Sequence, residues 1–224
     1  MSKKKIKLKT IVIVCEGQTE SNYFNEIRLD IRNNKVKVVP PKNVQGIQSA
    51  PEFLNAAWNA YWEEVLTFRS SNVLREKKVY RDDEVWCVFD KDNKTIGEMQ
   101  EFERLAEAYG FNVISSIPSF ELWFYLHFAD CPVEKKMLFT KLQKYGEKEL
   151  TVAIILSMLL EEWPKYHKGS SKKESRYLDI LRDNEINAIN RSLSMKSKAQ
   201  ELGYNKYTYP VTDVDVLVER LRKL

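Results

Sequence analysis

The sequence predicts an α/β fold with about four parallel strands flanked by helices, on the basis of two observations. First, the runs TIVIVC (residues 10–15) and EVWCVF (84–89) are almost wholly apolar, as strands covered on both faces of a sheet are. Second, segments with apolar residues at helical spacing lie between the predicted strands, so strands and helices alternate. This alternation indicates parallel strands joined by right-handed crossovers, which is a Rossmann-like core, here over residues 8–128.

The individual elements of this core have their own signals. The helix predicted at 51–65 carries Phe53, Trp58 and Tyr61 at helical spacing, and we expect this aromatic stripe to face a core. Gly110 ends the third helix, and Pro118 separates the fourth strand from the helix that follows. The predicted strands are 10–15, 35–39, 84–89 and 112–116, and the predicted helices are 19–33, 51–65, 96–109 and 119–128.

The remainder of the chain, 129–224, has only helical patterns, and we expect a helical region packed on or beside the α/β domain. Pro164 and the Gly169-Ser170-Ser171 stretch mark a loop inside this region. The predicted helices are 133–145, 148–163, 172–181, 185–202 and 213–224.

Composition excludes several classes of protein. With 43% hydrophobic and 30% charged residues among 224, the chain is neither disordered nor collagen-like. No apolar stretch reaches the ~20 residues that span a bilayer, and the N-terminus lacks the pattern of a secretory signal. We therefore expect a cytoplasmic location and no membrane partner. Three cysteines and two histidines without CxxC spacing disfavour a disulfide framework and a structural zinc site, so oxygen ligands are expected for any metal.

The charge is unevenly distributed although the net value is only +4. Five lysines precede the first acid, and residues 165–224 hold thirteen Lys and Arg against eight Asp and Glu. These clusters suit contacts with a polyanion such as DNA or RNA. Solvated faces and a charged terminus explain them equally well.

Acidic residues follow two of the predicted strands. Glu16 comes directly after the first strand and Asp90 after the third, with Asp92 two positions further and Glu20 on the next helix; Gly17 is expected to allow a sharp turn. Because ligands bind beyond the carboxyl ends of parallel strands, we expect these carboxylates to converge there. Converging carboxylates repel unless a cation neutralises them, and oxygen ligands favour Mg²⁺, with Mn²⁺ as the alternative. The implied chemistry is phosphoryl transfer.

Any one of these acids taken alone is better explained as a turn or helix-cap residue, whereas the set is better explained by a metal site. Other motifs are absent from the sequence. It contains no GxxxxGK[ST], GxGxxG or GxSxG, and the segment from Asp90 to Thr95 lacks the glycine of a calcium loop.

Three stretches together resemble a known family. EGQTESNYF, VWCVFDKD and IPSFELWFYLHF, in that order, resemble the RloB-like proteins, a branch of the Toprim superfamily found in prokaryotic restriction and phage-defence loci. The resemblance covers residues 10–128, with a weaker similarity at 166–168 and in the last helix. It implies a Toprim-type α/β core.

The resemblance also implies roles for particular residues. Asp90 and Asp92 correspond to metal ligands, Glu16 to an acid/base or metal-ligand glutamate, and Glu20 to a supporting ligand. Glu121 corresponds to an accessory acid, although a glutamate in a first helical turn explains it equally well.

Lys168 corresponds to a residue that contacts phosphate or stabilises the departing charge, whereas taken alone it is better explained as a surface lysine. A separately encoded ATPase is the partner that the resemblance implies, while the oligomeric state is left open.

The leading hypothesis is a magnesium-dependent nuclease that acts on DNA or RNA in a prokaryotic defence system. One alternative is a non-cleaving subunit that binds a nucleotide or nucleic acid and reports to an ATPase. Another is a phosphohydrolase with Asp90 as nucleophile and Asp92 as acid, which is disfavoured because that motif usually follows the first strand.

Overall fold

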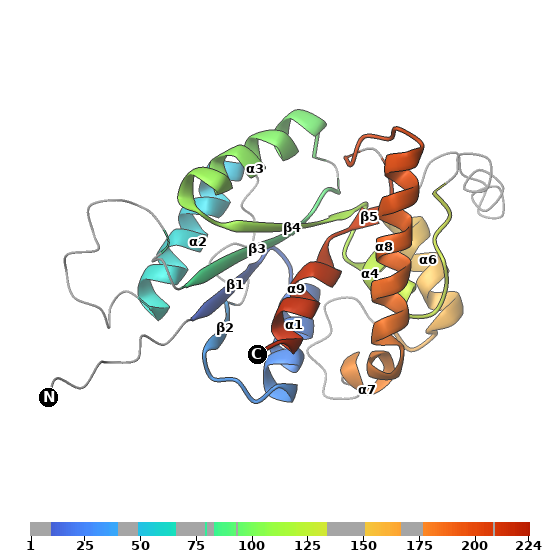
Figure 1. The fold of residues 1–224 in the computed structure, drawn as a ribbon, viewed down its shortest axis with the longest axis horizontal. Helices are drawn as coiled ribbons and strands as arrows, with labels where there is room; N and C mark the ends of the chain where they lie inside the picture. The colour runs from blue at the N-terminus through green and yellow to red at the C-terminus, as the bar shows by residue number, and fades with distance from the viewer. Residues whose placement is uncertain are drawn as a thin grey trace, which may run out of the picture. The chain divides into compact units, whose positions relative to one another are not determined.

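A computed structural model gives the arrangement of the chain, and it describes residues 10–39, 49–65, 79, 83–92, 94–133, 151–166, 177–207 and 209–224. Five strands form one sheet in the order β2-β1-β3-β4-β5 (Figure 1). They are β1 (Ile11–Cys15), β2 (Val36–Val39), β3 (Glu84–Asp90), β4 (Asn112–Ile117) and β5 (Val211–Thr212). The α/β class with a mostly parallel sheet is therefore confirmed.

The helices follow the predicted alternation. Three lie between the first four strands, at α1 (Gln18–Asp30), α2 (Ala50–Glu64) and α3 (Ile96–Tyr109), and α4 (Glu121–Leu126) follows β4. The C-terminal helices are α6 (Val152–Glu162), α7 (Tyr177–Leu181), α8 (Glu185–Glu201) and α9 (Val214–Arg222), with a short 3₁₀ helix at Arg182–Asn184. None of the described helices is both long and apolar enough to cross a membrane.

Two compact units divide the chain, one of residues 1–88 with 100–113 and the other of residues 89–99 with 114–224. In the first unit, β1 pairs in parallel with β2 on one side and β3 on the other. All five residues of β1 are buried, which explains why its sequence is apolar throughout instead of alternating. Asp83, just before β3, accepts hydrogen bonds from the N–H of Thr10, just before β1 (3.0 Å), and from the Tyr61 hydroxyl (2.9 Å).

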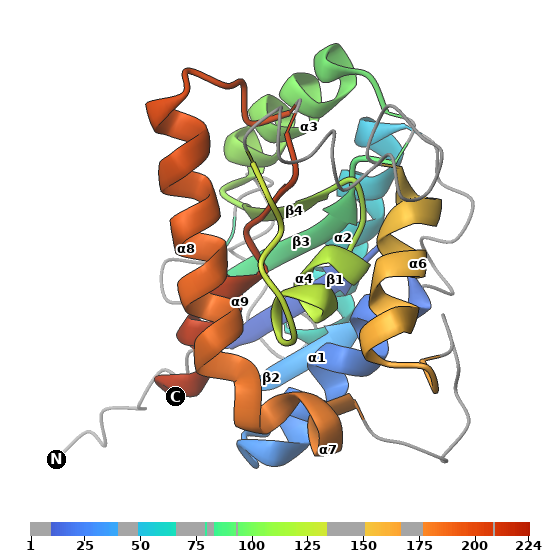
Figure 2. The ribbon, with the colours of Figure 1, turned by 90° about the vertical axis from the view of Figure 1, so that its right-hand side faces the viewer.

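The strand order determines which face each helix of this unit covers. The connection from β1 to β2 moves one way across the sheet, and the connection from β2 to β3 moves back past β1. Right-handed crossovers therefore place α1 and α2 on opposite faces (Figures 1 and 2). The expected aromatic stripe of α2 is buried on the core side, where Phe53 lies 5.4 Å from Phe102 of α3 between ring centroids.

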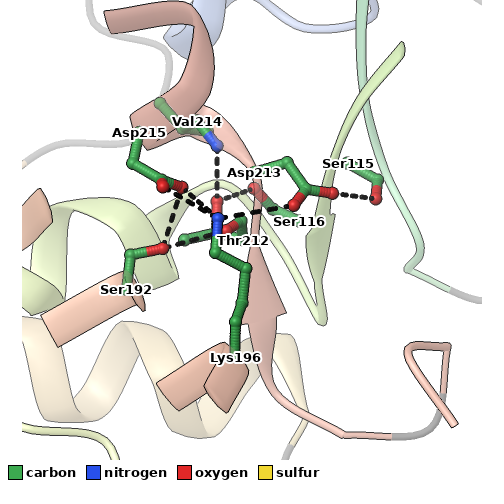
Figure 3. A network of polar contacts seen from close by, with 8 residues as sticks. All are labelled: Ser115, Ser116, Ser192, Lys196, Thr212, Asp213, Val214 and Asp215. Atoms are coloured by element: carbon green, nitrogen blue, oxygen red, sulfur yellow. Dashed lines mark hydrogen bonds and ion pairs between the residues drawn. The ribbon is translucent and has the colours of Figure 1, made fainter. Parts of the chain in front are cut away.

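In the second unit, the two-residue strand β5 pairs antiparallel with β4, so the sheet is mixed. Side chains hold this short strand in place (Figure 3). The Thr212 hydroxyl lies 2.8 Å from the Ser116 hydroxyl. The single hydroxyl hydrogen of Ser192 in α8 is shared between two acceptors, the Thr212 carbonyl (3.0 Å) and Asp215 (2.9 Å). Lys196 binds both oxygens of Asp215 at 2.8 Å. Helix α8 contacts β5 and α9 in this way (Figure 2).

The predicted boundaries differ from the observed ones in a few places. Strand β5 was not predicted, and α4 is shorter than the predicted helix 119–128. Several predictions lie outside the described residues: the N-terminal lysines, nearly all of the helix 133–145, the first residues of the helices 148–163 and 172–181, and the glycine-serine loop. The domain boundary at 128/129 stays a prediction.

Candidate functional site

The backbone of Glu16 continues the pairing of β1 with β3. Cys15 lies opposite Val88 in the parallel register, and the Glu16 N–H donates to the Val88 carbonyl at 3.0 Å. The half-buried Glu16 therefore leaves the sheet at the carboxyl end of β1, on a backbone that the ladder fixes. The sequence predicted this position, directly after the first strand.

Glu20 lies in the first turn of α1, and only 5% of it is exposed. Its carboxylate turns back over Gly17: a Cβ at position 17 would overlap Oε2 of Glu20 and lie 3.0 Å from Cδ and Oε1. Burial raises the pKa of the Cys15 thiol, and the charge of Glu20 is the second cause. The Glu20 carboxylate therefore lies close to the end of β1 and does not extend into solvent.

The expected role of Gly17 is wrong in its mechanism. Gly17 has φ −119° and ψ 167°, an extended conformation that any residue adopts. The glycine is needed because its missing side chain leaves the space that the Glu20 carboxylate fills. Glu16 and Glu20 thus lie at the same end of the first unit.

Asp90 and Asp92 belong to the second unit. Asp90 is the last residue of β3 and is 6% exposed, whereas Asp92 is exposed. The Lys91 N–H donates to the Ser116 carbonyl and the Asp92 N–H to the Pro118 carbonyl, both at 3.0 Å. These bonds hold Asp92 in the left-handed region at φ 42°, a conformation that Asp tolerates better than most residues.

Lys94 is a cation beside Asp90 that the sequence interpretation missed. Its Nζ donates to the Asp90 carbonyl at 2.8 Å and lies 5.9 Å from the centroid of the Phe89 ring. The ammonium therefore closes the turn after β3. A lysine four residues after the strand-end acid is the only sequence signal for this contact, and many surface turns share it.

Glu121 begins α4 and is 1% exposed. The hydroxyl of Tyr166, itself 4% exposed, donates to Oε1 of Glu121 at 3.0 Å. This glutamate is therefore buried in the second unit, unlike an ordinary solvated glutamate of a first helical turn. Two residues earlier, the Ser119 hydroxyl is fully buried and has no hydrogen-bond partner among the described residues.

The second unit thus brings three predicted acids to one end. The two backbone bonds from Lys91 and Asp92 tie the turn after β3 to the segment 116–118, and α4 with Glu121 starts just beyond it. Lys168 lies outside the described residues.

Across the described ranges, no group of three or more His, Cys, Asp and Glu side chains has the arrangement of a metal site. Glu20 of the first unit and Asp90 of the second are both buried carboxylates. Carboxylate oxygens are ligands that a hard divalent ion such as Mg²⁺ prefers, and the binding of such an ion by these residues stays a prediction.

A comparison with protein families gives a match that covers most of the chain. The model of the RloB-like protein family matches residues 11–221, nearly the whole chain. No curated protein and no solved structure matches.

Proposed function

Because the chain belongs to the RloB-like protein family, we propose that it is a divalent-metal-dependent nuclease that cleaves DNA or RNA in a prokaryotic defence system. The observation that carries the proposal is that Glu16 follows β1 and Asp90 ends β3, with the buried Glu20 in the first turn of α1. The role in defence is proposed because the resemblance is to proteins found in prokaryotic restriction and phage-defence loci. A separate ATPase is the partner we propose on the same ground.

The topology of the sheet supports this location for the reaction. Strand β1 lies between β2 and β3, and the connections from β1 to β2 and from β2 to β3 run in opposite directions. Such a reversal is a switch point, and ligands of open α/β sheets bind beyond the carboxyl ends of the strands there. Glu16 and Asp90 stand at those two strand ends.

In this proposal Glu16, Glu20, Asp90 and Asp92 hold Mg²⁺ or Mn²⁺, which when bound polarises the scissile phosphate. The chain itself fixes the ligands. The β1–β3 ladder orients Glu16, and the absent side chain of Gly17 gives the Glu20 carboxylate its place. We propose that the positive charges of Lys94 and Lys168 reduce the electrostatic repulsion between a polyanion and these acids.

The test is cleavage of single- and double-stranded DNA and RNA by the purified chain, alone and with the neighbouring ATPase. Mg²⁺, Mn²⁺ and EDTA are compared. We expect metal-dependent cleavage that falls on the order of 100-fold or more in Glu16→Gln and Asp90→Asn, because each removes a charged ligand.

Glu84→Gln is the matched control, since Glu84 begins the strand that Asp90 ends. It should cleave as the wild type does, and thermal unfolding in EDTA should be similar for all variants. Full activity in both Glu16→Gln and Asp90→Asn would contradict the proposal. Saturable nucleic-acid binding without cleavage would instead favour the non-cleaving subunit.

A further inference from the structure

Three tyrosines and a lysine lie in the connection between α8 and β5, whose sequence is GYNKYTYP (residues 203–210). The structure describes residues 203–207 and 209–210 of this connection, which we call the tyrosine loop (Figure 1). No acidic residue occurs between Glu201 and Asp213, so Lys206 gives the connection a net positive charge. Aromatic rings combined with positive charge are typical of surfaces that bind single-stranded nucleic acid.

The rings of Tyr204 and Tyr209 stack on each other. Their centroids lie 3.5 Å apart and their planes differ by 2°, so the two rings form a flat, parallel pair. Both side chains are half-buried, and among the described residues Tyr209 has no ring partner besides Tyr204. A nucleic-acid base that stacks on the Tyr209 ring would therefore extend the parallel arrangement by one more ring.

The tyrosine loop is fixed by its own backbone. The N–H groups of Gly203 and Tyr204 donate to carbonyls in the last turn of α8, at 3.0 and 2.9 Å, and Gly203 has φ 66°, where glycine is favoured. Tyr207 is buried, and its N–H donates to the side chain of Asn205 at 2.8 Å. Because the loop is already ordered, stacking a ligand on Tyr209 costs less conformational entropy.

Lys206 carries the charge of the loop. It is exposed, and its Nζ lies 4.8 Å from the centroid of the Tyr207 ring, a cation–π contact that holds the ammonium against the loop. Each base of a nucleic acid is joined to a phosphate, so a cation on the same loop as the stacked rings suits a strand that offers both groups.

Strand β5 joins the tyrosine loop to the carboxyl end of β4. The antiparallel pairing places Val211, which directly follows the loop, opposite Ile117, the last residue of β4. The carbonyl of the neighbouring Ser116 accepts the N–H of Lys91, in the turn that follows Asp90. The loop therefore meets the sheet at the strand ends of the second unit, where the reaction is proposed.

We propose that the tyrosine loop binds an unpaired base of a nucleic-acid strand, which stacks on the Tyr209 ring while Lys206 contacts a phosphate of the same strand. This inference rests on the proposed function and gives it a substrate class, a single strand or an unpaired stretch of a folded one. The base must be unpaired because a base inside a duplex is stacked on its neighbours and does not expose a face to the ring.

The test is the affinity of the full chain for labelled oligonucleotides of about 15 nucleotides, measured by fluorescence anisotropy in EDTA so that binding is separated from metal-dependent cleavage. The probes are a single strand of DNA, the same sequence as RNA, the DNA duplex, and an abasic single strand, which keeps the phosphates and lacks the bases. Thermal unfolding is recorded for every variant.

The variants separate the ring from its hydroxyl and from the charge. They are Tyr209→Ala, Tyr209→Phe and Lys206→Gln. Tyr109→Ala is the matched control, since Tyr109 of the first unit is also half-buried and stacked, with its ring 5.2 Å from that of Phe111 and the planes 19° apart.

We expect Tyr209→Ala to bind single-stranded DNA or RNA roughly tenfold more weakly than the wild type, because a stacked ring is lost. Tyr209→Phe keeps the ring and should bind within about twofold of the wild type, as should Tyr109→Ala. The Tyr209→Ala change should leave the affinities for the abasic strand and the duplex unaltered. Lys206→Gln should weaken the binding of every probe and reduce the salt dependence of binding by about one charge.

The outcomes separate this inference from the function on which it rests. Wild-type affinity for single strands in Tyr209→Ala overturns the inference alone, and so does an equal loss for the abasic strand, which is also what a folding defect would give. Ring-dependent binding of single strands by a chain that cleaves none of them with Mg²⁺ or Mn²⁺ supports the inference and contradicts the nuclease. A wild-type chain that neither binds nor cleaves any probe overturns both.

Discussion

Gly17 illustrates how one missing side chain shapes the candidate site. The space beside its Cα is filled by the carboxylate of Glu20, while its backbone is extended and makes no demand for glycine. Glycine at this position therefore leaves room for the carboxylate of Glu20, three residues further along the chain. The atom that a Cβ would displace is at the far end of the flexible Glu20 side chain, so we expect the substitution to change the stability of the fold little.

Gly17→Ala should consequently separate metal binding from stability. The new methyl group must push the Glu20 carboxylate away from the end of β1, and we expect Mn²⁺ affinity to fall about tenfold. The free energy of unfolding in EDTA should stay within about 1 kcal/mol of the wild type or rise, because alanine restricts the unfolded chain. Calorimetric titration and urea unfolding measure the two quantities.

Gly97→Ala is the control for that change. A Cβ at position 97 would lie 4.0 Å from its nearest neighbour, the hydroxyl of Thr95, so the side chain fits without displacing anything. Unaltered Mn²⁺ affinity in Gly17→Ala would show that the position of Glu20 does not matter for the ion.

The sequence predicted which residues stand at the strand ends but not how their side chains turn. Glu16 and Asp90 were found because an apolar run stops at an acid, and the observed strands end at or next to these residues. The direction of Glu20 and the pairing of Glu121 with Tyr166 depend on rotamers and on contacts far along the chain. No local pattern encodes either.

At the scale of elements, the long periodic helix α3 was predicted well and the two-residue strand β5 was missed. Helix α3 has the predicted bounds, 96–109, because its apolar spacing extends over several turns. Strand β5 has two residues, too few for any alternation to be visible, and its place is set by its pairing with β4 and by the Ser192 side chain of α8. It was missed for that reason.

The network around β5 predicts unequal effects for two acids that bind the same lysine. The Asp215 side chain is 2% exposed and lies 2.8 Å from Lys196, whereas that of Asp213 is 39% exposed and lies 3.6 Å away (Figure 3). Asp215→Ala removes the buried carboxylate that Lys196 binds with both oxygens and leaves Ser192 only the Thr212 carbonyl as acceptor, so we expect a loss of about 3 kcal/mol in the free energy of unfolding. Asp213→Ala should cost less than about 1 kcal/mol. Urea unfolding of both variants tests this difference, and equal losses would contradict it.

At the scale of the whole molecule, the family match changes the view of the C-terminal half. The sequence resemblance covered residues 10–128 firmly, whereas the family model extends to residue 221. The helices beyond α4 therefore lie within the part of the chain that the family model matches. Strand β5 of this half pairs with β4 in the sheet.

His127 makes the stability of the molecule depend on pH. Its Nδ1 lies 2.9 Å from the Trp123 carbonyl, and its ring meets the Trp123 ring edge to face at 4.9 Å. Burial lowers the pKa of His127 to about 4, with the nearby Arg191 charge adding to the effect and hydrogen bonds to backbone opposing it. The buried imidazole is therefore neutral at physiological pH.

This depressed pKa gives a signed expectation. In the unfolded chain His127 takes up its proton near pH 6.5, whereas the folded protein resists protonation until about pH 4. The neutral His127 contributes about 3 kcal/mol to the free energy of unfolding; this contribution is complete above pH 6.5 and is lost as the pH falls towards 4.

Urea unfolding of wild type and His127→Asn between pH 7.5 and 3.5 should therefore give free energies of unfolding that converge as the pH falls. His167→Asn, at the only other histidine, should leave that convergence intact. Parallel curves for wild type and His127→Asn would mean that the imidazole is not held neutral in the folded state.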